Sequence, residues 1–166
     1  MDGRGSRGRG SFGRRESGIN PILLTSEEET KSFAKNLAKE LIPGSVICLV
    51  GELGAGKTTF VKGLATFFGI LEEIVSSPTF TYMNQYHNLI HFDLYRLSNE
   101  DQFLSMGFDE YFAPPFITCI EWPNILDKAL PESYYLIELK HHVDGREILV
   151  KKITTENTER TAKKRE

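Results

Sequence analysis

One stretch, residues 51–58 with the sequence GELGAGKT, constrains the fold of this chain more than any other. It matches the phosphate-binding loop pattern G-x-x-x-x-G-K-[ST] at every fixed position. The apolar run 46–50, rich in β-branched residues, precedes it and predicts a buried strand. Residues 57–68 follow with apolar side chains at helical spacing, and Gly69 predicts the end of that helix. The loop therefore stands between a strand and a helix N-terminus.

The residue types in this loop suit the binding of a nucleotide. Glycines allow backbone N–H groups to turn toward an anion, and the helix N-terminus adds its own unpaired N–H groups and the positive end of its dipole. We expect Lys57 to reach the β- and γ-phosphates and the Thr58 hydroxyl to hold Mg²⁺. The alternative is a glycine-rich turn that matches by chance. The predicted nucleotide contacts from this segment are Glu52, Leu53, Gly54, Ala55, Gly56, Lys57, Thr58 and Thr59.

Composition indicates a globular protein without a membrane segment. The chain has 166 residues, of which 40% are hydrophobic and 26% charged, enough for one domain with its own core. No apolar run is long enough to cross a bilayer, and no apolar stretch follows the basic N-terminal residues as in a secretory signal. Cys48 and Cys119 lie in apolar runs, which predicts buried thiols in a reduced, cytoplasmic protein.

The charge of the chain is divided between its ends and its middle. Residues 1–18, rich in Arg, Gly and Ser, carry +3, residues 151–166 carry +3, and residues 19–150 carry −9. We expect residues 1–18 and 154–166 to be disordered tails around a domain at 19–153. RNA contact by the first tail is an alternative to a solvated extension, although its one aromatic residue offers little for base stacking. An acidic domain suits one nucleotide and a protein partner better than a broad nucleic-acid face.

The remaining elements predict an α/β fold. Thr25 and Ser26 stand before Glu28 and Glu29 as overlapping helix capping boxes. The order of elements predicts a P-loop NTPase-like domain, with a mostly parallel central sheet flanked by helices and antiparallel strands toward the C-terminus. Outside the loop unit, we expect strands at 20–24, 89–93, 116–120, 134–140 and 147–153, an extended run at 76–82, and helices after Ser26, within 100–112 and at 123–130.

Two acids are predicted to face the phosphate loop. Asp93 ends the strand at 89–93, and Glu121 stands at the carboxyl end of the strand at 116–120. In open α/β sheets, ligands bind beyond the carboxyl ends of the strands. We therefore expect both acids and the loop to meet in one crevice. Either acid could hold Mg²⁺ through water, and the residues alone leave the division of their roles open.

Other candidates each have a second interpretation. Thr79 could sense the γ-phosphate or serve as an ordinary turn hydroxyl. Trp122 could stack near the nucleotide or belong to the core. Arg96 could reach phosphate, a partner or an acid, while Arg146 could touch the nucleotide or lie solvated in a hairpin turn. His91 alternates with apolar strand residues, which favours a packed histidine over a catalytic one.

Four segments in this order and spacing resemble the TsaE (YjeE) family of small bacterial ATPases. They are residues 51–58, the sequence SPTF at 77–80, the sequence HFDLYRL at 91–97, and Glu121-Trp122. The resemblance covers about residues 20–150. It implies a role in the N6-threonylcarbamoyl modification of adenosine-37 in tRNAs that read codons beginning with A. It also implies ATP hydrolysis together with TsaB and TsaD, while TsaC supplies the threonylcarbamoyl-adenylate and tRNA is met through the complex.

The same resemblance implies roles for individual residues. Glu121 becomes the second protein ligand of Mg²⁺ beside Thr58, and Asp93 becomes an outer acid or orients water. Thr25 and Ser26 come close to the adenine side, although helix capping alone explains their presence. Residues 1–18 lie outside the resemblance and inherit nothing from it.

Rival functions remain open at this point. A small-molecule or nucleotide kinase shares the loop but needs basic residues that clamp its acceptor, and Lys and Arg are absent from residues 97–127. A nucleotide-gated binding module would differ only in whether hydrolysis matters. Arg96 and Arg146 are the only candidates for an arginine finger within the chain, so we expect slow hydrolysis alone and acceleration by partners.

Overall fold

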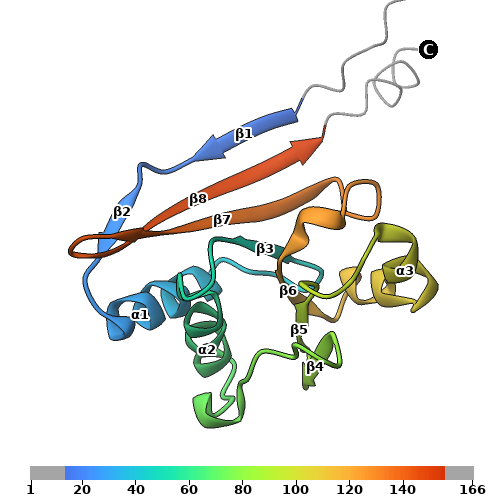
Figure 1. Ribbon diagram of the computed structural model, residues 1–166, viewed down its shortest axis with the longest axis horizontal. Coiled ribbons are helices and arrows are strands. Elements are labelled where there is room, and N and C mark those ends of the chain that lie inside the picture. Colours follow the sequence, from blue (N-terminus) through green and yellow to red (C-terminus); the bar gives the residue numbers. More distant parts are fainter. Residues whose placement is uncertain (1–13, 156–166) are drawn as a thin grey trace, which may run out of the picture.

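Figure 1 shows the computed structural model, which describes residues 14–155. Residues 1–13 and 156–166, which make up most of the two predicted tails, lie outside the described residues. The chain forms one eight-stranded sheet in the order β1-β8-β7-β3-β6-β5-β4, and β2 also pairs with β8. The strands are β1 (Arg14–Gly18), β2 (Ile22–Leu24), β3 (Val46–Val50), β4 (Met83–Tyr86), β5 (Leu89–Asp93), β6 (Ile117–Glu121), β7 (Ser133–His142) and β8 (Gly145–Thr155).

The centre of the sheet is parallel. β3 pairs in parallel with both β6 and β7, and β6 pairs in parallel with β5. β4 is antiparallel to β5 at one side, and β8 is antiparallel to β7, β1 and β2 at the other. The predicted α/β fold with a parallel core and antiparallel strands toward the C-terminus is confirmed. Such a parallel core is covered on both faces, which explains the unbroken apolar sequence of β3.

Helices cover both faces of the parallel strands (Figure 1). One hydrophobic cluster joins β3 and β6 to the helices α1 and α2, and a second joins β5 and β6 to α3 and η2. Because side chains alternate along a strand, Ile90 and Phe92 of β5 enter the second cluster while His91 and Asp93 lie on the opposite face. Among the described residues, no helix is long and apolar enough to cross a membrane. The helices are α1 (Glu27–Ala38), α2 (Lys57–Phe67), η1 (Glu72–Ile74), α3 (Glu100–Ser105), η2 (Phe108–Phe112) and η3 (Pro123–Ile125).

Local sequence signals place α1 and α2 next to each other. Ser26 caps α1, since its Oγ accepts a hydrogen bond from the Glu29 backbone N–H at 3.1 Å. The Glu29 carboxylate accepts the backbone N–H of Thr25, the residue before the N-cap, at 2.7 Å, so Ser26 and Glu29 form a variant of the predicted capping box. Gly63 of α2 allows the two helices to approach, because a Cβ there would lie 2.4 Å from the Lys31 carbonyl oxygen. The phosphate loop thus enters a helix that is tightly packed on its neighbour.

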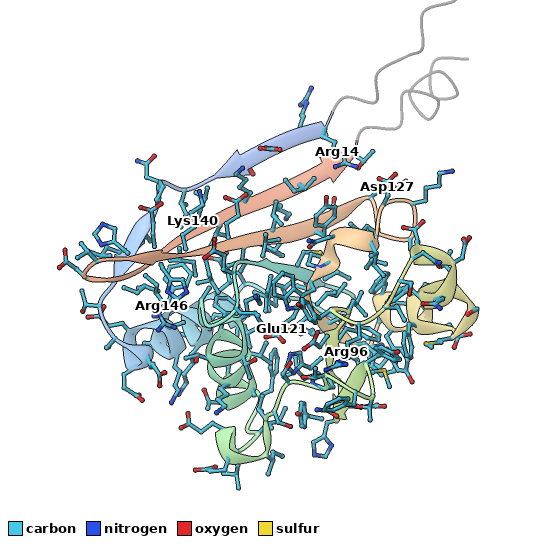
Figure 2. The ribbon with its side chains drawn as sticks, viewed as in Figure 1. Arg14, Arg96, Glu121, Asp127, Lys140 and Arg146 are labelled. Carbon is cyan, nitrogen blue, oxygen red and sulfur yellow. The ribbon has the colours of Figure 1, made fainter. Side chains whose placement is uncertain are left out.

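The boundary of the N-terminal tail differs from the prediction. Residues 14–18, expected to belong to a disordered tail, form β1 and pair with β8 from Gly18↔Lys151 to Arg14↔Thr155. All five side chains are exposed, so no apolar pattern marks this strand. Backbone pairing holds it, with ion pairs of 3.6 Å between Lys151 and Glu16 and 3.3 Å between Arg14 and Asp127 (Figure 2). β8 correspondingly extends to Thr155, two residues beyond the expected end of the domain.

Two further expectations are wrong. The helix expected at 123–130 is only the short 3-10 turn η3, because the Glu100 carboxylate accepts the backbone N–H groups of Asp127 and Ala129. Those N–H groups are therefore not available to a helix. The extended run expected at 76–82 ends in a turn, in which the Tyr82 N–H donates to the Pro78 carbonyl at 2.9 Å.

Candidate functional site

The phosphate loop joins the end of β3 to the start of α2. Gly54 and Gly56 have φ angles of 77° and 102°, in the left-handed region that favours glycine. Gly56 is the N-cap of α2 and offers no side chain to its first N–H groups. These unpaired N–H groups and the helix dipole make the loop suitable for an anion such as phosphate.

Lys57 is held back against its own loop. Its side chain is buried, and its Nζ donates hydrogen bonds to the carbonyls of Gly51 and Glu52. The same ammonium lies 3.9 Å from the centroid of the Trp122 ring. Burial lowers the pKa of Lys57, while the nearby carboxylates of Glu121 and Asp93 act in the opposite direction. The loop carbonyls therefore keep a cation beside the place that a phosphate would occupy.

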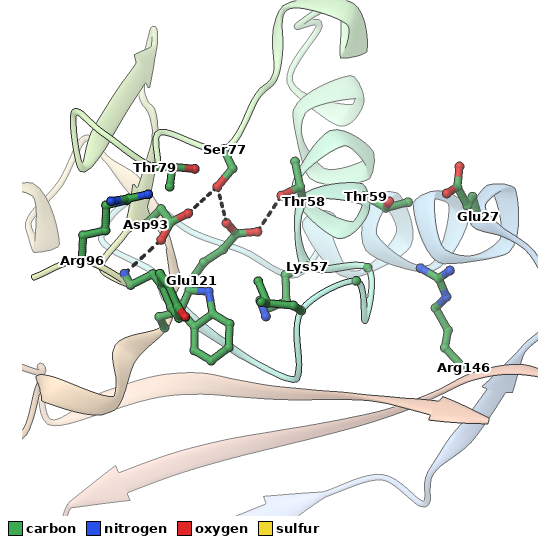
Figure 3. A pocket seen from close by; sticks show the side chains of 15 residues that line it. Glu27, Lys57, Thr58, Thr59, Ser77, Thr79, Asp93, Arg96, Glu121 and Arg146 are labelled. Carbon is green, nitrogen blue, oxygen red and sulfur yellow. Dashed lines mark hydrogen bonds between the residues drawn. The ribbon is translucent and has the colours of Figure 1, made fainter.

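Asp93 and Glu121 stand side by side at the carboxyl ends of two parallel strands. They are direct register partners in the β5–β6 pair, and both are buried. The Ser77 hydroxyl bridges them, at 2.5 Å from Asp93 Oδ2 and 2.8 Å from Glu121 Oε2. Figure 3 shows this bridge together with Thr58, whose Oγ1 donates to Glu121 Oε1 at 2.8 Å. The predicted meeting of both acids with the loop is thus present in the structure.

The neighbours of the acids orient both carboxylates and favour the charged form of Glu121. Burial alone would raise the pKa of the Glu121 carboxyl, but His91, Ser77 and Thr58 together hold this pKa below its ordinary value. The Asp93 carboxylate also accepts the Tyr95 backbone N–H at 3.0 Å. Glu121 is therefore an ionised, fully surrounded carboxylate at the base of the site.

A pocket of about 450 Å³ opens above this cluster. It brings together most of the predicted site residues, including the loop, both acids, Thr79, Trp122 and Arg146. The described residues that line it are Glu27, Leu53, Gly54, Gly56, Lys57, Thr58, Thr59, Ser77, Thr79, Asp93, Tyr95, Arg96, Glu121, Trp122 and Arg146.

Four predicted nucleotide contacts do not line this pocket. Thr25 and Ser26 serve the capping box of α1, and Ala55 is buried in the core. Glu52 faces a neighbouring hollow on the other side of the loop. A backbone contact from Ala55 or Glu52 to phosphate stays a prediction, because a loop binds phosphate through N–H groups and not through these side chains.

Two arginines lie at opposite ends of the pocket. In Figures 2 and 3, Arg96 and Arg146 stand on either side of Glu121. The Arg96 guanidinium lies 4.6 Å from the centroid of the exposed Phe80 ring. Arg146 lies close against the loop, since a Cβ on Gly56 would come within 1.9 Å of its Nη1. The hairpin arginine is thus brought to the site by the pairing of β8 with β2 and β7.

Several lining residues were not among the predicted site residues. Ser77 bridges the acids, and it begins the SPTF segment, so its place in that motif was a usable signal. Glu27 lies in the first turn of α1, and Tyr95 packs on Trp122 with ring centroids 5.0 Å apart. Tyr95 lies in the HFDLYRL segment, so its motif was also a usable signal, whereas no sequence pattern distinguishes Glu27 from an ordinary surface residue.

The oxygen atoms of this cluster fit Mg²⁺ bound together with a nucleotide. Within residues 14–155, no group of three or more His, Cys, Asp or Glu side chains could hold a metal ion by itself. Mg²⁺ in proteins usually takes one or two carboxylates and completes its shell with water and substrate phosphates. Thr58 with Glu121, and Asp93 beside them, match that pattern.

Comparisons with known proteins agree with this geometry. Residues 24–148 match the family described as "Threonylcarbamoyl adenosine biosynthesis protein TsaE". A protein of Bacillus subtilis named tRNA threonylcarbamoyladenosine biosynthesis protein TsaE is 43% identical over 121 residues, covering 70% of this chain and 75% of that protein. A Treponema pallidum protein of the same name is 42% identical over 129 residues, covering 75% and 95% respectively.

A solved structure has the same overall arrangement. The structure titled "Crystal structure of Bacillus subtilus YdiB" is 29% identical, with a TM-score of 0.61. The match covers 94% of this chain and 95% of the other. The similarity therefore extends over the whole sheet and its helices and is not limited to the phosphate loop.

Proposed function

This chain belongs to the TsaE family, and we propose from this that it takes part in making N6-threonylcarbamoyladenosine in tRNA. Its proposed chemical contribution is the binding and hydrolysis of ATP with Mg²⁺. One observation carries this proposal: Lys57 and Thr58 of the loop face the paired acids Asp93 and Glu121 in one pocket. Anion-binding and metal-binding groups are thus adjacent, as phosphoryl transfer requires.

Each residue has a defined task in ATP binding. The N–H groups at the start of α2 would hold phosphate oxygens. Lys57 would exchange its bonds with the loop carbonyls for a charge-assisted bond to the β- and γ-phosphates. Thr58 and Glu121 would hold Mg²⁺, which when bound neutralises charge on the phosphate oxygens. Arg146, which lies beside Gly56 at the end of the pocket opposite Arg96, would contact the nucleotide there.

Asp93 is the residue that we assign to the attacking water. In hydrolysis, a water oxygen bonds to the γ-phosphorus while the bond from that phosphorus to the bridging oxygen of ADP breaks. Asp93 would orient this water and receive its proton. The alternative is that Asp93 contacts Mg²⁺ through a water molecule. Asp93 Oδ1 accepts the Tyr95 N–H and Oδ2 accepts from the Ser77 hydroxyl, and these two bonds fix the direction of the carboxylate.

The pocket mouth suits completion by a protein partner. Leu53 and Tyr95 line the pocket with relative exposures of 70% and 54%, and Phe80, which is 79% exposed, lies against the lining residue Arg96. Exposed apolar surface is therefore present at the pocket. The negative charge of residues 19–150 favours a basic partner surface. We propose that TsaB and TsaD bind here, bring the chain to tRNA in the cytoplasm, and supply positive charge that accelerates hydrolysis.

Reconstitution tests this function. Threonylcarbamoylation of an ANN-decoding tRNA would be measured with TsaB, TsaC, TsaD and ATP, with and without this chain. We expect sustained modification only with the chain and not with its Lys57→Ala variant. Equal modification without the chain would contradict the proposal. An Asp93→Asn variant that cannot hydrolyse ATP but supports full modification would favour a nucleotide-gated binding module.

A further inference from the structure

We infer that His91 is a positioning residue that holds the Glu121 carboxylate in place for Mg²⁺. The Nε2–H group of His91 would donate to Glu121 Oε2 from below, while Oε1 accepts the Thr58 hydroxyl. This inference rests on the proposed role of Glu121 as a metal ligand. It gives a task to a buried polar side chain that the proposed chemistry does not otherwise use.

The strand register places His91 directly beneath the acids. His91 lies two residues before Asp93 on β5, so both side chains point to the same face of the sheet. On the neighbouring strand, His91 pairs with Cys119 and Asp93 pairs with Glu121. The imidazole therefore stands one step below the two carboxylates, and its Nε2 is 3.5 Å from Glu121 Oε2.

His91 has no other partner among the described residues. Its side chain is fully buried, and within residues 14–155 neither ring nitrogen makes a hydrogen bond of normal geometry. Buried polar atoms are nearly always paired, because an unpaired donor costs about 1–3 kcal/mol. The distance of 3.5 Å to Oε2 is only a few tenths of an ångström longer than a hydrogen bond. A hydrogen bond to Glu121 would thus offset the free-energy cost of burying this ring.

The charge of Glu121 determines which nitrogen carries the proton. With hydrogen on Nε2, the ring donates to an ionised oxygen and leaves only the weaker cost of an unpaired acceptor at Nδ1. With hydrogen on Nδ1, an Nε2 lone pair would face the carboxylate, and an N–H donor would be unpaired in the core. The first arrangement is favoured on both counts.

His91 differs from Thr58 and Ser77, the other two donors to Glu121, in the element of structure that carries it. Thr58 lies in the phosphate loop unit and Ser77 in the loop before β4, so both hydroxyls are placed to turn toward metal or nucleotide. His91 comes from the middle of β5, which pairs with β4 on one side and β6 on the other, so it cannot follow them. It would therefore hold the Glu121 carboxylate in place when Thr58 and Glu121 bind Mg²⁺. Outer partners of metal ligands commonly change metal affinity by about 10–100-fold.

Nitrogen NMR of the unmodified protein provides the first test. Long-range ¹H–¹⁵N correlations distinguish the two tautomers of a neutral imidazole. We expect the His91 ring, assigned by its absence from a His91→Gln spectrum, to carry hydrogen on Nε2. Hydrogen on Nδ1 would overturn the inference, and this measurement does not depend on a variant retaining its metal site.

Metal affinity provides the second test. Mn²⁺ binding would be measured by electron paramagnetic resonance with a β,γ-imido analogue of ATP bound, and nucleotide binding would be measured separately in EDTA. We expect His91→Phe to weaken Mn²⁺ binding about 10–100-fold, with metal-free nucleotide affinity within about twofold. His91→Gln, which retains an N–H donor, should recover most of the loss. Phe92→Leu, on the opposite face of β5, controls for loss of core packing.

The variants separate the two levels of the proposal. Parent-like Mn²⁺ affinity in His91→Phe, beside a large loss in Glu121→Ala, would show that His91 only packs in the core. An equal loss in Phe92→Leu and His91→Phe would show the same. Parent-like affinity in Glu121→Ala would instead remove the metal assignment, and the role of His91 with it.

Discussion

Thr58 and Glu121 are 63 positions apart in the sequence, yet the Thr58 Oγ1 donates a hydrogen bond of 2.8 Å to Glu121 Oε1. This bond ties the first turn of α2 to the carboxyl end of β6. The two oxygens that we propose as Mg²⁺ ligands are therefore already close together, so binding of the ion would need little rearrangement of these side chains. Preorganisation of this kind lowers the cost of binding.

Replacing Lys57 by alanine should weaken ATP binding. The loss of one charge-assisted contact to phosphate should cost about 1.5–3 kcal/mol, which corresponds to about 10–150-fold in Kd. Calorimetry is the measurement of choice, because Lys57 lies against Trp122 and its removal should also change the fluorescence of the single tryptophan. Lys35→Ala, on the exposed side of α1, is the control. An unchanged Kd in Lys57→Ala would exclude the loop as the phosphate site.

Removing either acid should affect turnover more than nucleotide affinity. Asp93→Ala and Glu121→Ala should each lower kcat by at least about tenfold, because water orientation and charge stabilisation matter most in the transition state. The measurements are steady-state ATP hydrolysis and the Kd for nucleotide. Glu40→Gln, an exposed acid outside the pocket, is the control. An acid whose removal leaves kcat at the parent value has a structural role only.

The isolated chain should hydrolyse ATP slowly, and TsaB with TsaD should accelerate it. An arginine supplied in trans can raise phosphoryl transfer rates by about 10³–10⁵. In the isolated chain, Arg96 is engaged with Phe80 and lies at one end of the pocket. The test compares turnover of the chain alone with turnover in the mixture. Fast hydrolysis alone that Arg96→Ala abolishes would show a site complete within this chain.

Gly63→Ala should destabilise the protein, although alanine normally favours a helix by about 1 kcal/mol over glycine. The added Cβ would lie 2.4 Å from the Lys31 carbonyl oxygen and 2.8 Å from the Ala34 Cβ. Pushing α1 and α2 apart should cost about 1–3 kcal/mol of unfolding free energy. Urea denaturation measures this loss, with Lys62→Ala in the same helix as the control. A more stable Gly63→Ala protein would show that the helices can separate freely.

The thiols of Cys48 and Cys119 should not react with thiol reagents in the folded protein. Burial raises the pKa of Cys48 to about 12, and burial also raises the pKa of Cys119. A thiol-specific reagent at pH 8 should therefore label neither residue in the native state and both in denaturant. Because the folded pKa of Cys48 exceeds the unfolded one, its contribution to stability is complete below about pH 9 and falls as the pH rises toward 12. Rapid native labelling would contradict this burial.

The central part of the fold could be predicted because local sequence and tertiary structure agree there. The loop at 51–58 has a fixed pattern, and β3 is apolar throughout. The positions of Asp93 and Glu121 followed from the general geometry of parallel sheets. Their direct register and the bridge through Ser77 depend on strand pairing, which one sequence does not reveal.

Other parts depend on interactions between distant residues. β1 has no buried side chain, and its strand form comes from the backbone of β8. The expected helix at 123–130 fails because Glu100 takes the N–H groups that it needs. Arg146 reached the loop through the pairing of β8 with β2, which the hairpin sequence does not indicate.

The pairing of Arg14 with Thr155 makes this domain suitable for circular permutation. These two residues are register partners at one end of the β1–β8 pair, so a short linker could join them with every strand pairing kept. New ends could then open at the exposed turn of His87 and Asn88 between β4 and β5. The same cut without the linker would divide Lys57 and Thr58 from Asp93 and Glu121. We expect two such fragments to bind nucleotide only when they reassemble. Nucleotide binding would then report whether the two fragments have come together.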